Sequence, residues 1–238
     1  MAYPSFKGTK KDETINGTAD NDTIHGLDGN DKIYGKAGDD QLYGDNGNDT
    51  IFGDAGKDKL YGGTGKNTLV GGEDADTYYL TTGKDNADTI IVAKSDSSLN
   101  LATMQKIIAT GIVTDIDQIN GFDKFDKLDL DIKGIAKNAN VDTTFDTAHF
   151  KNYSIKDGML TLKNGNAAVN INSKELLKEA FTYAVNNLKQ LPNDVAVGLK
   201  VTIDGTAHTL IMVDHTQSGV TAVDIVGTLN ALDPSQVF

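Results

Sequence analysis

The chain has 238 residues, which is enough for one large domain or two smaller ones. It carries 22 basic residues against 34 acidic ones, so its formal net charge is −12, and it contains no arginine. This composition argues against nucleic-acid binding, because such binding depends on cationic contacts to phosphate. The acidic balance favours a cation as partner, or no partner at all.

The sequence also lacks cysteines, long apolar runs and an apolar segment near its first residues. The chain contains no cysteine, so a disulfide framework is excluded and a thin core would need another kind of cross-link. No apolar run approaches the roughly 18 residues of a membrane span, so we expect none. The first residues, MAYPSFKGTKK, lack the apolar core of a signal peptide.

The N-terminal third of the chain repeats every nine residues, and eight consecutive units keep one phase without an insertion. The first position is always glycine, at Gly8, Gly17, Gly26, Gly35, Gly44, Gly53, Gly62 and Gly71. The sixth position reads Glu13, Asp22, Asp31, Asp40, Asp49, Asp58, Asn67 and Asp76. The eighth position reads Ile15, Ile24, Ile33, Leu42, Ile51, Leu60, Leu69 and Tyr78.

Each part of this repeat has a physical interpretation. Glycines allow a sharp turn over the first six residues, and the last three residues form a short strand with its central side chain pointing inward. Two units then make one turn of a flattened parallel coil, and units two apart stack on the same edge. Their aspartates converge there with backbone carbonyls in an oxygen-rich hole that suits calcium better than magnesium. Without a cation the aspartates repel one another, so we expect metal binding to supply folding energy.

A disordered Gly/Asp-rich tract is the alternative interpretation of this segment. Disorder does not require an apolar residue at the same position of every unit. We therefore expect disorder only in the absence of metal.

The repeat resembles the RTX nonapeptide, G-G-x-G-x-D-x-U-x, from Gly8 to about Leu80. The resemblance implies a β-roll that binds several Ca²⁺ ions. In that family one site takes positions two, four and six of one unit and positions one, three and six of the unit two further on. Four sites follow by carry-over: Leu27, Gly29, Asp31 with Gly44, Asn46, Asp49; Lys36, Gly38, Asp40 with Gly53, Ala55, Asp58; Thr18, Asp20, Asp22 with Gly35, Ala37, Asp40; and Asp54, Gly56, Asp58 with Gly71, Glu73, Asp76.

Some of the candidate ligand positions depart from the family pattern. Asp20 stands where the pattern has glycine, and Glu13 stands where it has aspartate. A further site, built from Asp45, Gly47 and Asp49, meets Asn67 instead of an aspartate. We expect that site to be weaker, because it has lost one charge.

The ninth position is mostly aromatic and carries a second pattern. Alternate units fall on the same face, so Tyr43, Tyr61 and Tyr79 are expected to stack on one face and Tyr34, Phe52 and Val70 on the other. One interpretation is a cross-strand ladder, or a surface covered by the rest of the chain. The other is a self-association or partner surface, because contiguous apolar patches mark contacts.

The segment after the repeat contains a predicted helix and an acidic stretch. Residues 100–111, NLATMQKIIATG, have helical apolar spacing. The stretch DIDQINGFDKFDKLDLDIKG resembles a segment that follows the repeats in serralysin-type proteases and related exported proteins. Its acids, Asp123, Asp126, Asp129 and Asp131, alternate with apolar residues. Solvated strand charges are the favoured interpretation, and a further calcium site is the alternative.

The remainder of the chain is predicted to be β-rich, with one further helix. Hairpin turns are predicted at Asp157-Gly158, Asn164-Gly165 and Asp204-Gly205, and an amphipathic helix over 174–191. The final residues, TAVDIVGTLNALDPSQVF, resemble the C-terminus of type I secreted proteins, particularly bacterial surface-layer proteins. The fold class is therefore mainly β: a calcium-bound parallel β-roll over 1–80 and a β-rich C-terminal domain over 81–238 with one or two helices, which carries a type I secretion signal.

We expect no catalytic residues, because none of the four histidines lies in an H-E-x-x-H motif and the chain has no G-x-S-x-G motif. The leading hypothesis is a non-enzymatic, calcium-binding module of an exported, surface-layer-like bacterial protein, located outside the cell or on its surface. Its expected partners are calcium, a type I secretion machinery, and other copies of itself or the cell surface. The alternative is the non-catalytic C-terminal part of an RTX protease, lipase or polysaccharide-modifying enzyme.

Overall fold

The fold is mainly β, as the sequence predicts, and divides into two compact units. The first unit takes residues 1–97 and 115–130, and the second takes 98–114 and 131–238. In this computed structural model the described residues are 4–92, 116–130, 134–135, 139–142, 152–156, 159–164, 167–171, 176, 179–180, 183, 195–203, 206–215 and 219–226.

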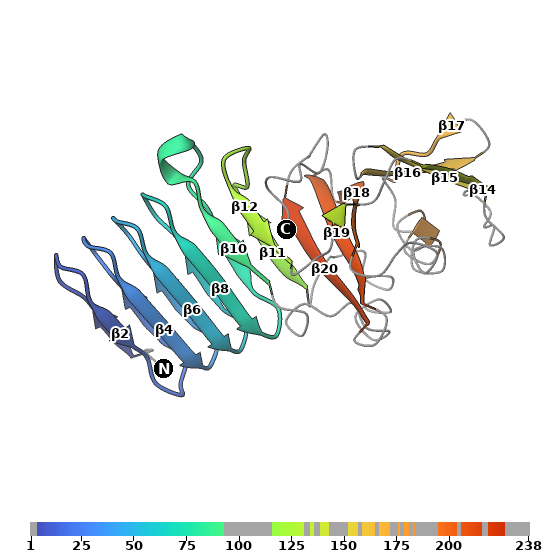
Figure 1. The fold of residues 1–238 in the computed structure, drawn as a ribbon. Coiled ribbons are helices and arrows are strands. Elements are labelled where there is room, and N and C mark those ends of the chain that lie inside the picture. The colour runs from blue at the N-terminus through green and yellow to red at the C-terminus, as the bar shows by residue number, and fades with distance from the viewer. Residues whose placement is uncertain are drawn as a thin grey trace. The chain divides into compact units, whose positions relative to one another are not determined.

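The first unit is a flattened coil with two parallel sheets, and each turn contributes one strand to each sheet (Figure 1). One sheet contains β1 (Ser5–Lys7), β3 (Thr23–His25), β5 (Gln41–Tyr43), β7 (Lys59–Tyr61), β9 (Thr77–Tyr79) and β11 (Asp117–Asn120). The other contains β2 (Thr14–Asn16), β4 (Lys32–Ala37), β6 (Thr50–Ala55), β8 (Thr68–Glu73), β10 (Thr89–Ile91) and β12 (Lys127–Asp129). This arrangement confirms the predicted parallel β-roll.

The core of the roll is one column of apolar side chains per sheet. Strand partners lie 18 residues apart, as in the pairs Ile33 with Ile51 and Leu42 with Leu60. The eighth-position side chains have 0 % exposure from Ile24 to Tyr78. Ile15, in the first turn, is only half-buried. With one apolar residue per unit the core is thin, so burial alone gives each turn little stability.

From the unit that begins at Gly26 onward, the turns use left-handed backbone at the second and fourth positions of each unit. At the fourth position, the glycine residues adopt a strongly positive φ, for example +127° at Gly29. A Cβ at Gly29 would also lie 2.6 Å from the carbonyl carbon of Lys11, in the turn below. The second position is left-handed too, yet here it is often not glycine: φ is +78° at Leu27 and +83° at Lys36. These residues adopt a conformation that costs about 1–2 kcal/mol with a side chain present.

The parallel stacking continues beyond residue 80, although the nine-residue spacing does not. Ile90 stacks on Leu69, and Leu128 stacks on Ile90, in the sheet that contains β10 and β12. In the other sheet Ile119 stacks on Tyr78. These three residues have 0 % exposure, so they extend the apolar columns of the roll. A short 3-10 helix, η1 (Lys84–Asn86), lies in the turn before β10.

The second unit contains a mixed sheet in the order β20-β19-β18-β16-β15-β14. Its strands are β14 (Ala139–Asp142), β15 (Asn152–Lys156), β16 (Met159–Asn164), β18 (Val195–Ile203), β19 (Thr206–His215) and β20 (Gly219–Val226). Two short strands join this sheet: β13 (Gly134–Ile135) pairs with β18, and β17 (Ala167–Ala168) pairs with β16.

The strand pairing confirms the three predicted hairpins. β15 pairs antiparallel with β16, β16 with β17, and β18 with β19. Within the predicted helix over 174–191, the described residues Leu176, Glu179, Ala180 and Tyr183 are helical. The predicted helix over 100–111 and the final residues 227–238 lie outside the described residues. In the described part of the chain, no helix combines the length and the apolar character that a membrane span requires.

The left-handed second position leads to a stability prediction. Lys36 is exposed and has φ +83°, so Lys36→Gly removes strain without removing a buried contact. We expect the free energy of unfolding in calcium to rise by about 1 kcal/mol, measured by urea denaturation. Lys59→Gly is the control, because it removes the same charge from strand β7, where φ is not left-handed. That variant should lose about 0.5–1 kcal/mol, and equal effects of the two substitutions would contradict the strain argument.

Candidate metal centre

Acidic side chains form two buried rows, one along each edge of the roll. One row is Asp22, Asp40, Asp58, Asp76 and Asp117, and the other is Glu13, Asp31, Asp49, Asn67, Asp88 and Asp126. In each row the backbone N–H of one member donates to the Oδ1 of the next, at 2.6–2.9 Å. Apart from Glu13, the members are at most 2 % exposed. The rows therefore place carboxylates of successive turns side by side.

The second oxygen of these carboxylates is buried and has no hydrogen-bond donor. This holds for the Oδ2 atoms of Asp31, Asp40, Asp49, Asp58 and Asp88. Each Oδ2 of a repeat unit lies close to the first-position glycine of that unit: a Cβ at Gly26 would lie 2.6 Å from the Oδ2 of Asp31. A buried, unpartnered carboxylate oxygen is costly unless a cation or a proton occupies it. The rows therefore fit a bound cation.

The pKa values of these acids are raised, which reflects the energetic cost of burying a charged carboxylate. Burial raises the pKa of Asp58 and Asp88 to about 7. It also raises the pKa of Asp40, Asp49 and Asp126 to about 6. Desolvation is the main cause, and neighbouring acids of the same row add to it, whereas the backbone hydrogen bonds oppose it. Without a cation, the folded roll therefore binds protons on these groups at a higher pH than an exposed carboxylate does.

The carry-over sites place two carboxylates and several carbonyls on each edge. In the site that begins at Leu27, the Oδ1 of Asp49 accepts from the backbone of Asp31 at 2.8 Å. Two of its carbonyls already accept across the turn: that of Leu27 from Asn46 N at 2.8 Å, and that of Asn46 from Gly29 N at 3.0 Å. Among the described residues no three acidic or histidine side chains converge. Carbonyls would therefore have to supply the remaining oxygens of a calcium shell.

The remaining carry-over sites repeat this arrangement, with some local differences. The pairs Asp40 with Asp58 and Asp58 with Asp76 have the same hydrogen bond, at 2.8 Å. Backbone pairing also joins second- and third-position residues two units apart along this edge: Lys36, Ala37, Asp54, Ala55, Gly72 and Glu73.

The site that begins at Thr18 is arranged differently. The Oδ2 of Asp22 accepts from Thr18 N at 2.6 Å and from its hydroxyl at 3.0 Å, so this oxygen already has partners. Asp20 is exposed, and the positive φ found at the fourth position of later units is absent there. The carboxylate of Asp45 is occupied by other partners, because it lies 3.0 Å from the Nδ1 of His25 and accepts from Leu27 N at 3.3 Å.

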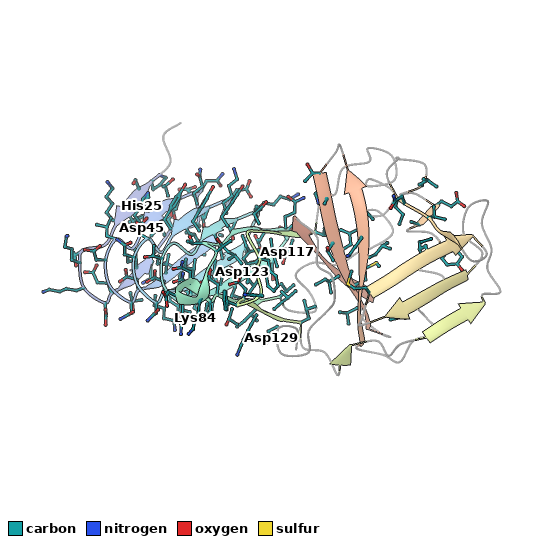
Figure 2. All side chains as sticks on the ribbon, turned by 90° about the horizontal axis from the view of Figure 1, so that it is seen from above. His25, Asp45, Lys84, Asp117, Asp123 and Asp129 are labelled. Carbon is teal, nitrogen blue, oxygen red and sulfur yellow. The ribbon has the colours of Figure 1, made fainter. Side chains whose placement is uncertain are left out.

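Two buried acids, Asp88 and Asp117, were not predicted as ligands, and for a third, Asp126, a calcium site was only the alternative interpretation. The favoured interpretation of solvated strand charges is wrong for Asp126, which has 0 % exposure, whereas Asp123 and Asp129 are half-buried and Asp131 lies outside the described residues. Figure 2 labels Asp117, Asp123 and Asp129 of this segment. A signal was available in the sequence: each of these three acids stands two residues before a core residue, at Ile90, Ile119 and Leu128. These acids do not follow the nine-residue period, so that period alone does not identify the shorter D-x-apolar pattern.

A second pair of ladders, at the fifth position, was also missed. The Oδ1 of Asn30 accepts from Asn48 N, and the Oδ1 of Asn48 accepts from Lys66 N, both at 2.8 Å. On the other edge the Oδ1 of Asp39 accepts from Lys57 N at 2.9 Å. These exposed side chains lie next to the buried acids in sequence. They fix the spacing of the turns that carry the carboxylate rows.

The ninth-position aromatics form the predicted ladder. Ring centroids are 4.4 Å apart in the stacked pairs His25–Tyr43, Tyr43–Tyr61 and Tyr61–Tyr79. On the opposite face Tyr34 stacks on Phe52 at 4.9 Å. The rings therefore cover each other's faces, and this supports the interpretation as a cross-strand ladder. Their ring edges and hydroxyl groups are the parts that a partner would meet.

The comparisons with known proteins agree with this geometry. Residues 8–42, 43–78 and 53–90 match the family of the RTX calcium-binding nonapeptide repeat (4 copies). A search of curated proteins found no significant match. Among solved structures, the chain is similar to the AlgE6R3 subunit of the Azotobacter vinelandii mannuronan C5-epimerase, with 18 % identity and a TM-score of 0.29 over 97 % of this chain and 80 % of the other. That TM-score is too low to support an argument, so the repeat match stands on its own: residues 8–90 contain RTX-type calcium-binding repeats.

The fifth-position ladder predicts a role for an exposed amide. Asn48→Ala removes the acceptor of Lys66 N and leaves Asn48 N donating to Asn30. We expect the free energy of unfolding in calcium to fall by about 1 kcal/mol, measured by urea denaturation. Asn48→Asp is the matched control, because it keeps the acceptor oxygen and should restore most of the loss. If the alanine variant is as stable as wild type, the ladder does not stabilise the turns.

The raised pKa values predict how calcium-free protein responds to pH. The acids titrate near 3.9 when unfolded but at about 6 to 7 in the folded roll. Between these values the folded state binds more protons, so its stability is greatest at low pH and falls as pH rises toward 7. In chelator, the far-UV circular dichroism signal of the β-roll should therefore be larger at about pH 5 than at about pH 7.5. Calcium should remove or reverse this trend, because it needs the ionised carboxylates, and a signal in chelator that does not change with pH would contradict the assignment.

Proposed function

We propose that the chain is a calcium-dependent folding module of an exported bacterial surface protein. One observation carries the proposal: five buried carboxylates in the two rows have Oδ2 atoms without hydrogen-bond partners, and successive members of each row are joined by the same hydrogen bond from turn to turn. The five are Asp31, Asp40, Asp49, Asp58 and Asp88. Such rows destabilise the roll while they are empty and charged. A divalent cation with many oxygen ligands converts the same rows into cross-links between turns.

Calcium-dependent folding is proposed to be coupled to export of the protein. RTX repeats are typical of secreted bacterial proteins, and cytosolic free calcium is low. On this view the chain stays unfolded in the cell, passes a type I secretion machinery by means of a C-terminal signal, and folds where calcium is available. The resemblance of the final residues to surface-layer proteins supports this route. The role is non-catalytic: the roll supplies calcium-held structure.

At the cell surface, the same module is proposed to attach the protein or to associate with further copies. The feature that suits this role is the aromatic ladder from His25 to Tyr79, whose half-buried rings lie on the outside of one sheet. Because the ring faces are covered within the chain, contact would be made through the ring edges and the tyrosine hydroxyls. Sedimentation velocity of the calcium-loaded chain tests this part of the proposal separately.

Calcium titration of chelator-treated protein, followed by far-UV circular dichroism, tests the folding switch. We expect a cooperative gain of β signal with calcium, because each ion joins two turns and prepares the next site. Magnesium is the control and should produce a much smaller gain, since it prefers a smaller octahedral shell that keeps its waters. A chain that already has its full β signal in chelator would overturn the switch even if calcium still binds.

A further inference from the structure

The row that begins at Glu13 is interrupted at Asn67 and then continues through Asp88 to Asp126, beyond the end of the nonapeptide repeats. Asn67 replaces the acid in its middle, so the second oxygen position there is an amide Nδ2. After Asn67 the row continues through Asp88 to Asp126, where both members are again carboxylic acids with 0 % exposure. Asp126 lies beyond residue 90, where the match to the repeat family ends.

We propose that Asp88 and Asp126 form a separate cation site that fastens segment 116–130 to the roll. The inference rests on the proposed calcium binding of the roll, but it adds a site that the repeat pattern does not contain. The site also has a structural role of its own. Residues 116–130 follow Asp88 only after a long connection, and a shared ion ties the two parts of the chain together.

The contacts of Asp88 leave one oxygen for a ligand. Its Oδ1 accepts from Asn67 N at 2.9 Å, and its backbone N–H donates to the Oδ1 of Asp126, also at 2.9 Å. Its Oδ2 is buried and has no donor at hydrogen-bonding distance and angle, although the Asn67 side chain lies near enough to lower the pKa of Asp88 against the larger effect of burial. Strands β10 and β12 pair in register on the next three residues of each segment, so the two acids are held at equivalent points of adjacent turns. A single ion can therefore bridge them.

The surroundings of the pair favour a hard divalent cation. Asp123 adds a third acid nearby, although its carboxylate is occupied by the backbone N–H groups of Gly83 and Phe125, both at 2.8 Å. The Oδ2 of Asp126 accepts from Asp123 N at 2.7 Å, which orients the Asp126 carboxylate. Burial raises the pKa of Asp88 and of Asp126, and repulsion from the Asp123 carboxylate raises both further. A divalent ion with oxygen preference, calcium above all, relieves that repulsion.

Asn67 also sets this site apart from the rest of the row. An ion between Asp49 and Asn67, or between Asn67 and Asp88, would meet only one carboxylate. The Asp88–Asp126 pair is therefore insulated from the Asp31–Asp49 pair, and it should fill independently of the repeats. Different ions therefore hold the repeats and segment 116–130, and the two sets of sites fill in separate steps.

The experiment compares Asp126→Asn and Asp88→Asn with wild type in the full chain. Asparagine keeps the Oδ1 acceptor and removes the charge, and Asn67 already fills an equivalent place, where it accepts from Asp49 N at 2.9 Å. Both variants should therefore fold in calcium, which far-UV circular dichroism checks. Asp85→Asn is the matched control, because Asp85 is exposed in the same turn as Asp88.

Two readouts are needed: the number of bound calcium ions, by native mass spectrometry, and amide hydrogen exchange. We expect each of the two variants to bind one calcium fewer than wild type, and the control to bind the same number. Exchange of the Lys127 amide, which donates to the carbonyl of Asp88 at 2.8 Å, should become about tenfold faster, whereas strands β4 and β6 should be unchanged. The tenfold figure corresponds to the loss of one modest interaction.

The outcomes separate this inference from the proposed function. Wild type that binds several ions, with Asp126→Asn binding as many and exchanging at the same rate, overturns the inference alone. Wild type that binds no calcium overturns the proposed function and, with it, the site. Loss of one ion without any change at Lys127 would overturn the fastening role, because the ion would then not hold β12 on the roll.

Discussion

The structure of the first unit depends on burying a carboxylate at the same point of every turn. Most of these carboxylates accept one backbone N–H of the preceding turn on their edge, as Asp49 does from Asp31, and several leave their other oxygen enclosed. The accepted hydrogen bond fixes the stacking of adjacent turns. The enclosed oxygen carries negative charge that a cation has to balance, and the acidic chain, which has no arginine, does not balance it with its own side chains at this point.

The glycines follow from that constraint. A side chain at a first-position glycine such as Gly26 would collide with the enclosed oxygen, and one at a fourth-position glycine such as Gly29 would collide with the backbone of the turn below. The second position is different, since Leu27 and Lys36 adopt the left-handed conformation with a side chain present. The roll tolerates this strain because the stacked backbone hydrogen bonds and the acid rows over-determine the turn. A thin core combined with strained turns makes a folded state that depends on its cation.

The sequence predicted the roll, its phase and its apolar columns, because period and residue type together define both the turn and the strand. It also predicted the ring stacking of Tyr43, Tyr61 and Tyr79. It did not predict Asp88 or Asp117, and it favoured solvated charge over a calcium site at Asp126, because loops of other lengths precede these acids and the nine-residue period is lost. Nor did it predict the fifth-position ladder, since Asn and Asp in a turn are ordinarily explained by their own local hydrogen bonds.

The acids that the nine-residue period does not predict show which short sequence element all turns of the coil share. What persists through β10, β11 and β12 is the triplet of an acid, a spacer and a core residue, as in Asp88-Thr89-Ile90 and Asp126-Lys127-Leu128. The acid stacks by accepting a backbone N–H from the neighbouring turn, and the apolar residue stacks in the core, so the turn before them can vary in length. A regular repeat therefore makes equivalent sites, whereas this triplet alone is enough to continue the coil. The triplet lets a segment from far along the chain join the same acid row, where one ion can hold it.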